Sequence, residues 1–328
     1  MKAAISKEFT GIFKEEFENF LEYKKALGQY KNIDGKLLYD YLALNRFLDT
    51  YKLKEIILTE EMTSAYLELG EQLSQSTRHH HECNIRQFAK FLKMQGYENI
   101  YVQYDCAVKM PRDYIPYVFS DEEIKKIFLI LDSRNSIYDR YDSQLFYQTL
   151  IRLLYCTGLR LGEALDLKID DVDLANRIIT INNGKGNVSR LVPFKASLCE
   201  WLIDYNKKKA KAGDTYFFES PLGGRRSNHS ISKTFRNTIL PRAGINLESV
   251  NGHSRGPCIH SWRHTFACNA LDQMIKEGKD PYCALPYLSV YLGHTDITNT
   301  EIYLRLTLQR YDEIVNAGHY IYEKVLGG

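Results

Sequence analysis

The sequence predicts a mainly α-helical protein of two domains, the second of which contains a small antiparallel β-sheet. Three observations support this fold class. The chain has 328 residues, more than a single hydrophobic core usually serves. Apolar residues recur at helical spacing over most of the chain. The run Met110–Pro116, which has two close prolines, interrupts this periodicity and indicates an extended linker between domains.

The first domain is expected to be a bundle of four helices within residues 1–112. The apolar-periodic stretches that predict these helices cover about residues 9–29, 35–49, 59–74 and 76–94. Phenylalanines recur on one stripe of the first helix, and Thr59 followed by two glutamates has the composition of a helix start.

The second domain, residues 113–328, is expected to begin with a helix that starts at a capping box. Ser120 and Glu123 have the spacing at which each side chain bonds to the backbone N–H of the other residue. Further helices are expected at about residues 142–156, from 161, and at 230–240, 259–274 and 286–291, with a last helix from the capping box at 298–301.

One β-hairpin is expected among these helices. Residues 177–182 and 188–194 are rich in β-branched and apolar side chains. The segment NGKGN at 183–187 joins them and contains the Asn-Gly dipeptide that tight hairpin turns favour. We therefore expect Lys185 at or near the hairpin tip.

The composition is that of an ordinary soluble globular protein, with 44% hydrophobic and 26% charged residues. The net charge of +2 gives no global basic footprint, so any surface that binds nucleic acid must be a local concentration of charge. The seven scattered cysteines indicate reduced thiols and a cytoplasmic location. No signal peptide or membrane helix is expected, because the apolar runs are too short.

The stretch IHSWRHTF at residues 259–266 concentrates cationic and hydrogen-bonding side chains. On a helix, His260, Arg263 and His264 project from one face, because residues three and four apart are neighbours. Arginine can bind a phosphate in two places, and histidine can transfer a proton near neutral pH. Taken alone, such a face is more often an ordinary salt-bridged surface, so its meaning depends on other segments.

Four segments together resemble the tyrosine recombinase (phage integrase) family. They are TGLRLGEALDL at 157–167, GKGNVSRLVPF at 184–194, HSWRHTF at 260–266 and LGHTDITNTEIYLR at 292–305. The resemblance implies a SAM-like, core-binding helical domain followed by an α-rich catalytic domain with a small sheet. The long connection at about 273–286 is similar to integrases of transposons and related mobile elements. Trp262 departs from the family, which usually has an aliphatic residue there.

The resemblance implies that Tyr303 is the nucleophile, which becomes covalently joined to a 3′ phosphate of DNA. It implies that Arg160 and Arg263 bind the non-bridging oxygens of that phosphate. Phosphoryl transfer needs neutralisation of charge on these oxygens. The sequence has neither a metal-binding carboxylate cluster nor a P-loop motif, so no cofactor, metal or nucleotide is expected and the arginines take this role.

Four further residues complete the implied site. His260 corresponds to the proton-transfer partner and Lys185 to the general acid that protonates the leaving 5′ oxygen. His294 corresponds to a hydrogen-bond donor to the phosphate, and Glu163 to an acidic supporting position. Ionising an ordinary tyrosine at pH 7 costs about 4 kcal/mol, so a nearby imidazole base assists. Simpler readings exist, since Arg160 can merely pair with Glu163 and Lys185 can be an exposed turn lysine.

The implied partner is double-stranded DNA, around which the two domains would close as a clamp. The candidate DNA-binding residues are Arg190, Arg225, Arg226, Lys233 and Arg236. Recombination requires four protomers on two duplexes, so a homotetramer in the synaptic complex is expected, together with accessory proteins in some reactions. The amphipathic run at 311–326 is expected to dock on a neighbouring protomer. No membrane partner is expected.

Two other functions share parts of this pattern. A type IB topoisomerase uses the same chemistry to relax supercoils without exchanging strands. A DNA-binding accessory protein without cleavage activity is the alternative from another class. The cluster HHHEC at 79–83 is also compatible with a metal site, but neighbouring histidines on a helix point in different directions, which favours a packing or DNA-facing role.

Overall fold

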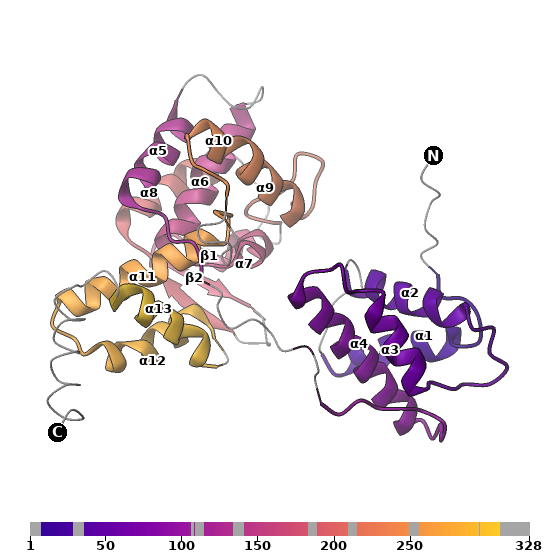
Figure 1. Cartoon of the computed structure of the whole chain (residues 1–328). Helices are drawn as coiled ribbons and strands as arrows, with labels where there is room; N and C mark the ends of the chain where they lie inside the picture. Colours follow the sequence, from indigo (N-terminus) through magenta and orange to yellow (C-terminus); the bar gives the residue numbers. More distant parts are fainter. Residues whose placement is uncertain are drawn as a thin grey trace, which may run out of the picture. The chain divides into compact units, whose positions relative to one another are not determined.

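The computed structural model confirms the predicted fold class: helices predominate, and one small antiparallel sheet accompanies them (Figure 1). The chain divides into two compact units, Met1–Arg112 and Asp113–Gly328. Among the described residues, none of the helices is both long and apolar enough to cross a membrane. The residues that the structure describes are 8–28, 36–105, 108, 115–133, 141–182, 189–208, 215–248, 256–294 and 296–308.

The first unit contains a bundle of four helices. They are α1 (Lys14–Ala26), α2 (Lys36–Asp49), α3 (Glu60–Glu68) and α4 (Gln75–Met94). Helix α4 packs against each of the other three. Its residue Phe88 stacks on Phe17 of α1, with ring centroids 3.9 Å apart. Thr59 and Ser74 cap α3 and α4 through their side-chain oxygens. The bundle therefore has an aromatic core of its own.

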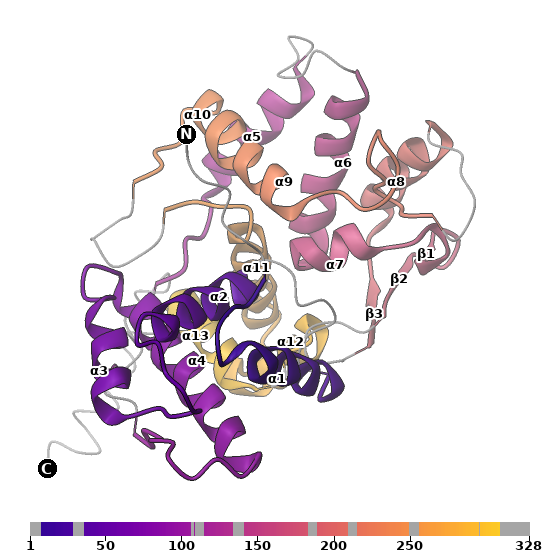
Figure 2. The ribbon, with the colours of Figure 1, turned by 90° about the vertical axis from the view of Figure 1, so that its right-hand side faces the viewer.

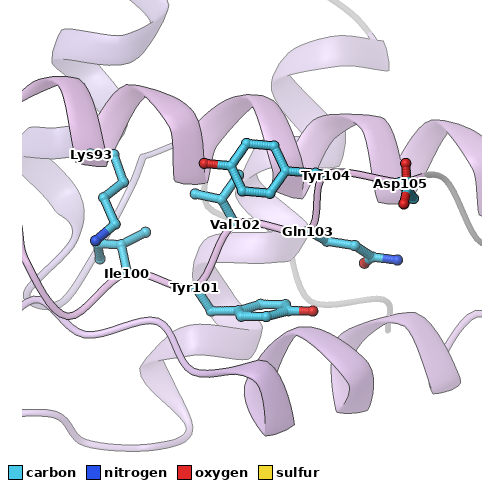
Figure 3. A pocket seen from close by; sticks show the side chains of 7 residues that line it. All are labelled: Lys93, Ile100, Tyr101, Val102, Gln103, Tyr104 and Asp105. Atoms are coloured by element: carbon cyan, nitrogen blue, oxygen red, sulfur yellow. The ribbon is translucent and has the colours of Figure 1, made fainter.

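The chain that leaves this bundle lies along α4. Glu82 of α4 is buried and accepts hydrogen bonds from the side chain of Gln103, at 2.9 Å, and from the backbone N–H of Val108, at 3.0 Å. Figure 3 shows an open pocket on this segment, with Lys93 and Tyr104 among its lining residues. The pocket holds none of the residues expected to take part in catalysis.

The second unit is larger and, in its described part, combines nine α-helices, one 3₁₀ turn and one π-helical turn with a sheet. The capping box predicted at Ser120 is confirmed, with both reciprocal hydrogen bonds to Glu123. The helical segments are α5 (Asp121–Asp132), α6 (Tyr141–Thr157), α7 (Leu161–Asp166), η1 (Ile169–Asp171), α8 (Ala196–Lys208), α9 (Asn228–Thr234), the π-helical turn η2 (Phe235–Ile239), α10 (Leu240–Arg242), α11 (Ser261–Lys276), α12 (Pro281–Leu292) and α13 (Thr298–Leu308).

The sheet has three antiparallel strands in the order β1-β2-β3. The strands are β1 (Val172–Asp173), β2 (Ile178–Ile181) and β3 (Arg190–Pro193). Ile181 pairs with Arg190, so β2 and β3 form the predicted hairpin. The sequence did not predict β1. Figure 2 shows the sheet at one edge of the unit, next to α7 and α8.

Helix α11 lies between two hydrophobic cores of the second unit. It packs against α6, α12 and α13, and Figure 1 shows the last two alongside it. Trp262 belongs to the larger core around α6, whereas Ala267 and Leu271 belong to a smaller core with α12 and α13. Because both faces of α11 are covered, its polar residues Arg263 and His264 lie in the interior.

The start of α12 differs from the prediction, and α13 has an additional hydrogen bond at its start. Helix α12 begins at Pro281 and not at Pro286, because Asp280 caps it by accepting two backbone N–H groups of the first turn. Pro286 lies inside the helix, where its side chain is exposed. Helix α13 begins at Thr298 as expected, but the carboxylate of Asp296 accepts the backbone N–H of Thr298 at 2.9 Å.

We expect Trp262→Ala to lower the free energy of unfolding by about 3–5 kcal/mol, the usual cost of removing a buried large aromatic side chain. Trp262 is 0% exposed and packs against Phe119, Tyr155 and Phe235. Trp262→Phe is the matched control. It should cost less, because it keeps an aromatic ring and removes an indole N–H that has no hydrogen-bond partner among the described residues. Urea unfolding measures both values; equal losses would contradict the argument.

Candidate active site

The turn after α6 begins the candidate site. Gly158 follows the last residue of α6 and has a left-handed backbone, with φ of +62°. A Cβ atom at this position would lie 2.4 Å from the ring of Phe266, so only glycine fits. The turn directs the carbonyl oxygen of Gly158 to the guanidinium of Arg263, at 2.9 Å, and brings Arg160 to the first turn of α7.

Glu163 holds two arginines through its carboxylate. Its oxygens lie 2.7 Å from a guanidinium nitrogen of Arg160 and 2.8 Å from one of Arg190. The backbone N–H of Arg160 also donates to Glu163, at 2.9 Å. Burial would raise the pKa of this carboxyl, but the hydrogen bonds from Arg190 and Arg160 outweigh it and lower the pKa to about 2. Glu163 is therefore an anion throughout the physiological range.

Arg190, a candidate DNA-binding residue, contacts a carboxylate of its own chain. The exposed fraction of its side chain is 8%, and it forms a bidentate ion pair with Glu163. Its Nε also donates to the carbonyl oxygen of Tyr291, at 2.8 Å. Arg190 thus connects strand β3, helix α7 and the end of α12. These contacts give Arg190 a structural role in the free protein, and its contact with DNA stays a prediction.

Arg263 is held by the carboxyl ends of two helices. It is 2% exposed, and its two terminal nitrogens donate to the carbonyl oxygens of Gly158, at 2.9 Å, and Leu292, at 2.7 Å. The negative ends of helix dipoles favour a cation at such positions. Burial and the charge of Arg160 lower its pKa to about 10, which still leaves it charged at neutral pH.

Tyr303 of α13 meets a histidine of α11. The phenolic oxygen lies 3.0 Å from Nδ1 of His264, within hydrogen-bond distance. Tyr303 is 2% exposed and His264 is 8% exposed. Burial, followed by the neighbouring His260 and Arg263, lowers the pKa of His264 to about 3. The sequence analysis placed His264 on the same face as His260 but gave it no role, since spacing alone cannot show which imidazole reaches the tyrosine.

His260 lies at the amino end of α11, and its side chain is exposed. Its ring is nearly perpendicular to that of His264, with centroids 4.7 Å apart. His260 therefore stands between solvent and the buried pair of His264 and Tyr303. It has the exposure that contact with an incoming phosphate requires.

His294 follows Gly293, which ends α12 in a left-handed conformation. Its Nδ1 lies 2.7 Å from the hydroxyl of Thr300, which is fully buried. Its ring lies 6.3 Å from that of Tyr303, centroid to centroid. Burial and the charges of Arg263 and Arg160 lower the pKa of His294 to about 4. Thr300 was overlooked as a supporting residue because its position also fits a helix start.

Two of the other candidate DNA-binding arginines also hold structure. The guanidinium of Arg236 donates to the carbonyl oxygens of Pro257, at 2.9 Å, and Leu247, at 3.2 Å. That of Arg226 lies 3.8 Å from the ring centroid of Phe146. Arg236 therefore fixes the segment that leads to α11, a role that its place in the sequence does not reveal.

The remaining two candidates lie at the surface of the second unit. Arg225 pairs with Asp166 at 2.5 Å, and a third of its side chain remains exposed. Lys233, in the last turn of α9, is exposed.

Lys185, the expected general acid, lies outside the described residues.

The histidine cluster of α4 packs locally. Nδ1 of His79 lies 2.6 Å from the carbonyl oxygen of Val108, and its Nε2 lies 3.5 Å from the sulfur of Cys83. Within the described ranges, no three His, Cys, Asp or Glu side chains are grouped so that they could hold a metal ion. The contacts agree with the packing role that the sequence favoured.

Comparison with known proteins finds a matching family and similar sequences. A model described as the phage integrase family matches residues 118–310. A Sinorhizobium fredii protein named as an integrase/recombinase, y4rB, is 31% identical over 298 residues, which cover 89% of this chain and 92% of the relative. The tyrosine recombinase XerC of Oceanobacillus iheyensis is 28% identical over 328 residues, with 94% and 96% covered.

Solved structures share the fold. The XerH site-specific recombinase bound to difH substrate, in a pre-cleavage complex, is 21% identical with a TM-score of 0.61, covering 88% of this chain and 81% of that one. The Tn1549 transposon integrase in complex with transposon right end DNA is 15% identical with a TM-score of 0.61, covering 95% and 99%. The chain thus has the architecture of both proteins.

We expect Glu163→Gln to lower the free energy of unfolding at pH 7 by about 3–5 kcal/mol, because it leaves two partly buried guanidinium groups facing a neutral amide. The folded pKa of about 2 lies below the ordinary value. The carboxylate therefore adds stability above about pH 4.3, and this is lost as the pH falls towards 2. The variant should show less acid destabilisation in that window.

Urea unfolding at pH 7, 4 and 3 measures both effects. Asp272→Asn is the matched control, because Asp272 pairs with Lys276 at the surface and should contribute less than about 1 kcal/mol. Parallel pH curves for the wild type and Glu163→Gln would contradict the assignment of Glu163.

Proposed function

The chain belongs to the phage integrase family, and on that premise we propose that it is a site-specific DNA recombinase that cleaves and rejoins strands through a covalent 3′-phosphotyrosine intermediate. The observation that carries the proposal is the convergence of Arg160, Arg263, His294 and Tyr303. Both arginines donate to carbonyl oxygens of the turn at the end of α12, and His294 follows that turn beside Tyr303. Cations and a phenol thus meet in one place, as phosphoryl transfer to tyrosine requires.

In the proposed reaction, Tyr303 attacks the scissile phosphorus and the 5′ oxygen leaves. Arg160 and Arg263 bind the non-bridging oxygens. Each guanidinium has five N–H donors, and Arg160 is 21% exposed, so donors remain for a phosphate. Because these groups are fixed before DNA arrives, they stabilise the transition state without costly reorganisation. The energy of the broken bond is conserved in the phosphotyrosine, so rejoining needs no nucleotide.

Lys185 and His260 complete the proposed proton transfers and phosphate contacts. An alkoxide is about as basic as hydroxide, whose parent water has a pKa of about 15.7, so the leaving oxygen needs a proton donor. We assign this role to Lys185, which the sequence predicts to lie near a hairpin tip. His260 is exposed at the amino end of α11, where it can meet the phosphate and exchange a proton with it.

Both units are expected to contact DNA, and the second unit also carries the catalytic residues. Residues 1–112 would form the core-type DNA-binding domain, and residues 113–328 the catalytic domain. On the second unit, Lys233 and Arg225 are the surface cations suited to phosphate contacts. The structural neighbours include both a transposon integrase and Xer-type recombinases, so origin from a mobile element stays a proposal.

The proposed reaction exchanges strands between two duplexes, so it needs four protomers in the synaptic complex. The segment 311–326, expected to dock on a neighbouring protomer, lies outside the described residues. Some DNA targets are expected to require accessory proteins as well. The expected site of action is the cytoplasm, on the DNA that carries the target sequence.

Two rival activities make different predictions. A type IB topoisomerase would relax any supercoiled plasmid, whereas a recombinase requires its target site. An accessory protein would bind DNA without forming a covalent adduct. The convergence of Arg160, Arg263 and Tyr303 favours cleavage chemistry over accessory binding.

We expect the wild-type protein to form a covalent adduct with its target DNA and Tyr303→Phe to form none, because the variant lacks the attacking oxygen. Labelled fragments of the DNA that flanks its gene, with a nick that traps cleavage, are the substrates. The adduct should survive denaturant and be removed by protease. Equal adduct from both proteins would reject Tyr303 as nucleophile, and relaxation of a plasmid without a target would favour the topoisomerase.

We expect DNA affinity to fall steeply with salt, because neutralised phosphates release counterions. Lys233→Ala should reduce the slope of log affinity against log salt by about 1, if this lysine contacts one phosphate. Lys208→Ala is the matched control, since Lys208 is exposed on α8 and pairs with Asp204. Fluorescence anisotropy from 50 to 300 mM salt provides the slopes. A slope unchanged by Lys233→Ala would remove this residue from the interface.

A further inference from the structure

A buried hydrogen bond joins the proposed nucleophile to a histidine without an assigned role. Nδ1 of His264 lies 3.0 Å from the phenolic oxygen of Tyr303. The two residues come from different helices, α11 and α13, which pack together in the smaller core. Water has little access, since their exposed fractions are 8% and 2%. By contrast, His260 is exposed and its ring contacts His264.

The neutral form of His264 can accept a hydrogen bond from the phenol. Burial and the neighbouring His260, Arg263 and His294 hold the pKa of His264 near 3, so its imidazole is neutral. A neutral imidazole has one N–H and one acceptor nitrogen. In the tautomer whose hydrogen is on Nε2, Nδ1 accepts the phenolic O–H, and His264 then orients the oxygen of Tyr303.

We propose that His264 is a further catalytic residue, whose Nδ1 accepts the phenolic proton of Tyr303 as the bond to phosphorus forms. The inference rests on the proposed function. It transfers the role of proton acceptor from His260, which the sequence suggested, to the imidazole that touches the nucleophile. His260 then remains at the surface for the phosphate.

The proton balance is complete. As the bond from the Tyr303 oxygen to phosphorus forms, the phenolic proton moves to Nδ1 of His264. The bond from phosphorus to the 5′ oxygen breaks, and that oxygen takes a proton from Lys185. On rejoining, the 5′ oxygen returns its proton to Lys185 and attacks phosphorus, and the departing phenolate recovers its proton from His264.

Substrate binding would raise the basicity of His264. Burial, the neighbouring His260 and then Arg263 lower the pKa of His264 in the free protein. A phosphodiester carries one negative charge, and one bound by Arg263 and Arg160 would offset part of the effect of Arg263 and raise the proton affinity of His264.

The test compares His264→Asn and His264→Gln with the wild type on the nicked substrate. The Asn side chain can place an oxygen near the position of Nδ1, so it can hold the phenol but not accept its proton. We expect adduct formation to slow by about 10²–10⁴-fold, the usual contribution of a general base, while the anisotropy-measured DNA affinity and the Tm stay close to wild type.

Two readouts separate proton acceptance from a structural role. The rate for His264→Asn should rise with pH from 7 to 9 as solvent replaces the base, more steeply than that of the wild type. A substrate with sulfur in place of the 5′ bridging oxygen needs no proton donor, so it should rescue Lys185→Ala but neither His264 variant.

The opposite results would overturn the inference. They are wild-type rates in both His264 variants, pH profiles parallel to the wild type, or rescue of the His264 variants by the sulfur substrate. If an Asn or Gln variant loses DNA binding or folding, the other variant decides. The absence of an adduct from the wild type on its target would instead reject the proposed function, and this inference with it.

Discussion

The buried carboxylate of Glu163 is the interaction on which the candidate site depends. Arg160, Arg190 and Arg263 converge in the interior of the second unit, where like charges repel more strongly than in water. Glu163 is the anion that two of them bind directly. A buried charge is tolerated only when it is paired and hydrogen-bonded. Without this carboxylate, the arginines would have to move outward or remain unpaired.

The carboxyl ends of α6 and α12 provide the second part of this arrangement. Carbonyl oxygens of Gly158 and Leu292 accept hydrogen bonds from Arg263, and that of Gly293 accepts one from Arg160. Both helices end at a left-handed glycine, and the last carbonyls of a helix have no partner within it, so they can accept from the arginines. The main chain thus fixes the arginines before any phosphate binds, so the positive charge is preorganised rather than recruited.

Much of this arrangement could be predicted from the sequence. The helix stop at Gly158, the hairpin and the capping box at Ser120 depend on local residue preferences, and the structure confirms each of them. The partner of Arg190 could not be predicted, because an arginine on a strand is equally suited to a phosphate and to a carboxylate 27 residues away in the chain. Only tertiary packing decides which anion it meets.

The same limit explains the histidines. His260 and His264 are one turn apart, so helical spacing treats them as equivalent. Their difference arises because α13 covers one end of the shared face: His264 becomes buried against Tyr303 while His260 stays in contact with solvent. Likewise, Thr300 looks like part of a helix start until the fold brings His294 to its hydroxyl.

Burial of a neutral histidine beside arginines has a consequence for when the site can react. The surroundings that lower the pKa of His264 and His294, burial first and then the neighbouring positive charges, keep both imidazoles neutral while no phosphate is bound. An anion bound by Arg160 and Arg263 would cancel part of that positive field at short range, where screening by salt is weakest. Its charge would raise the proton affinity of His264, the proposed proton acceptor. The two arginines would then both bind the substrate and make the basicity of His264 depend on its arrival.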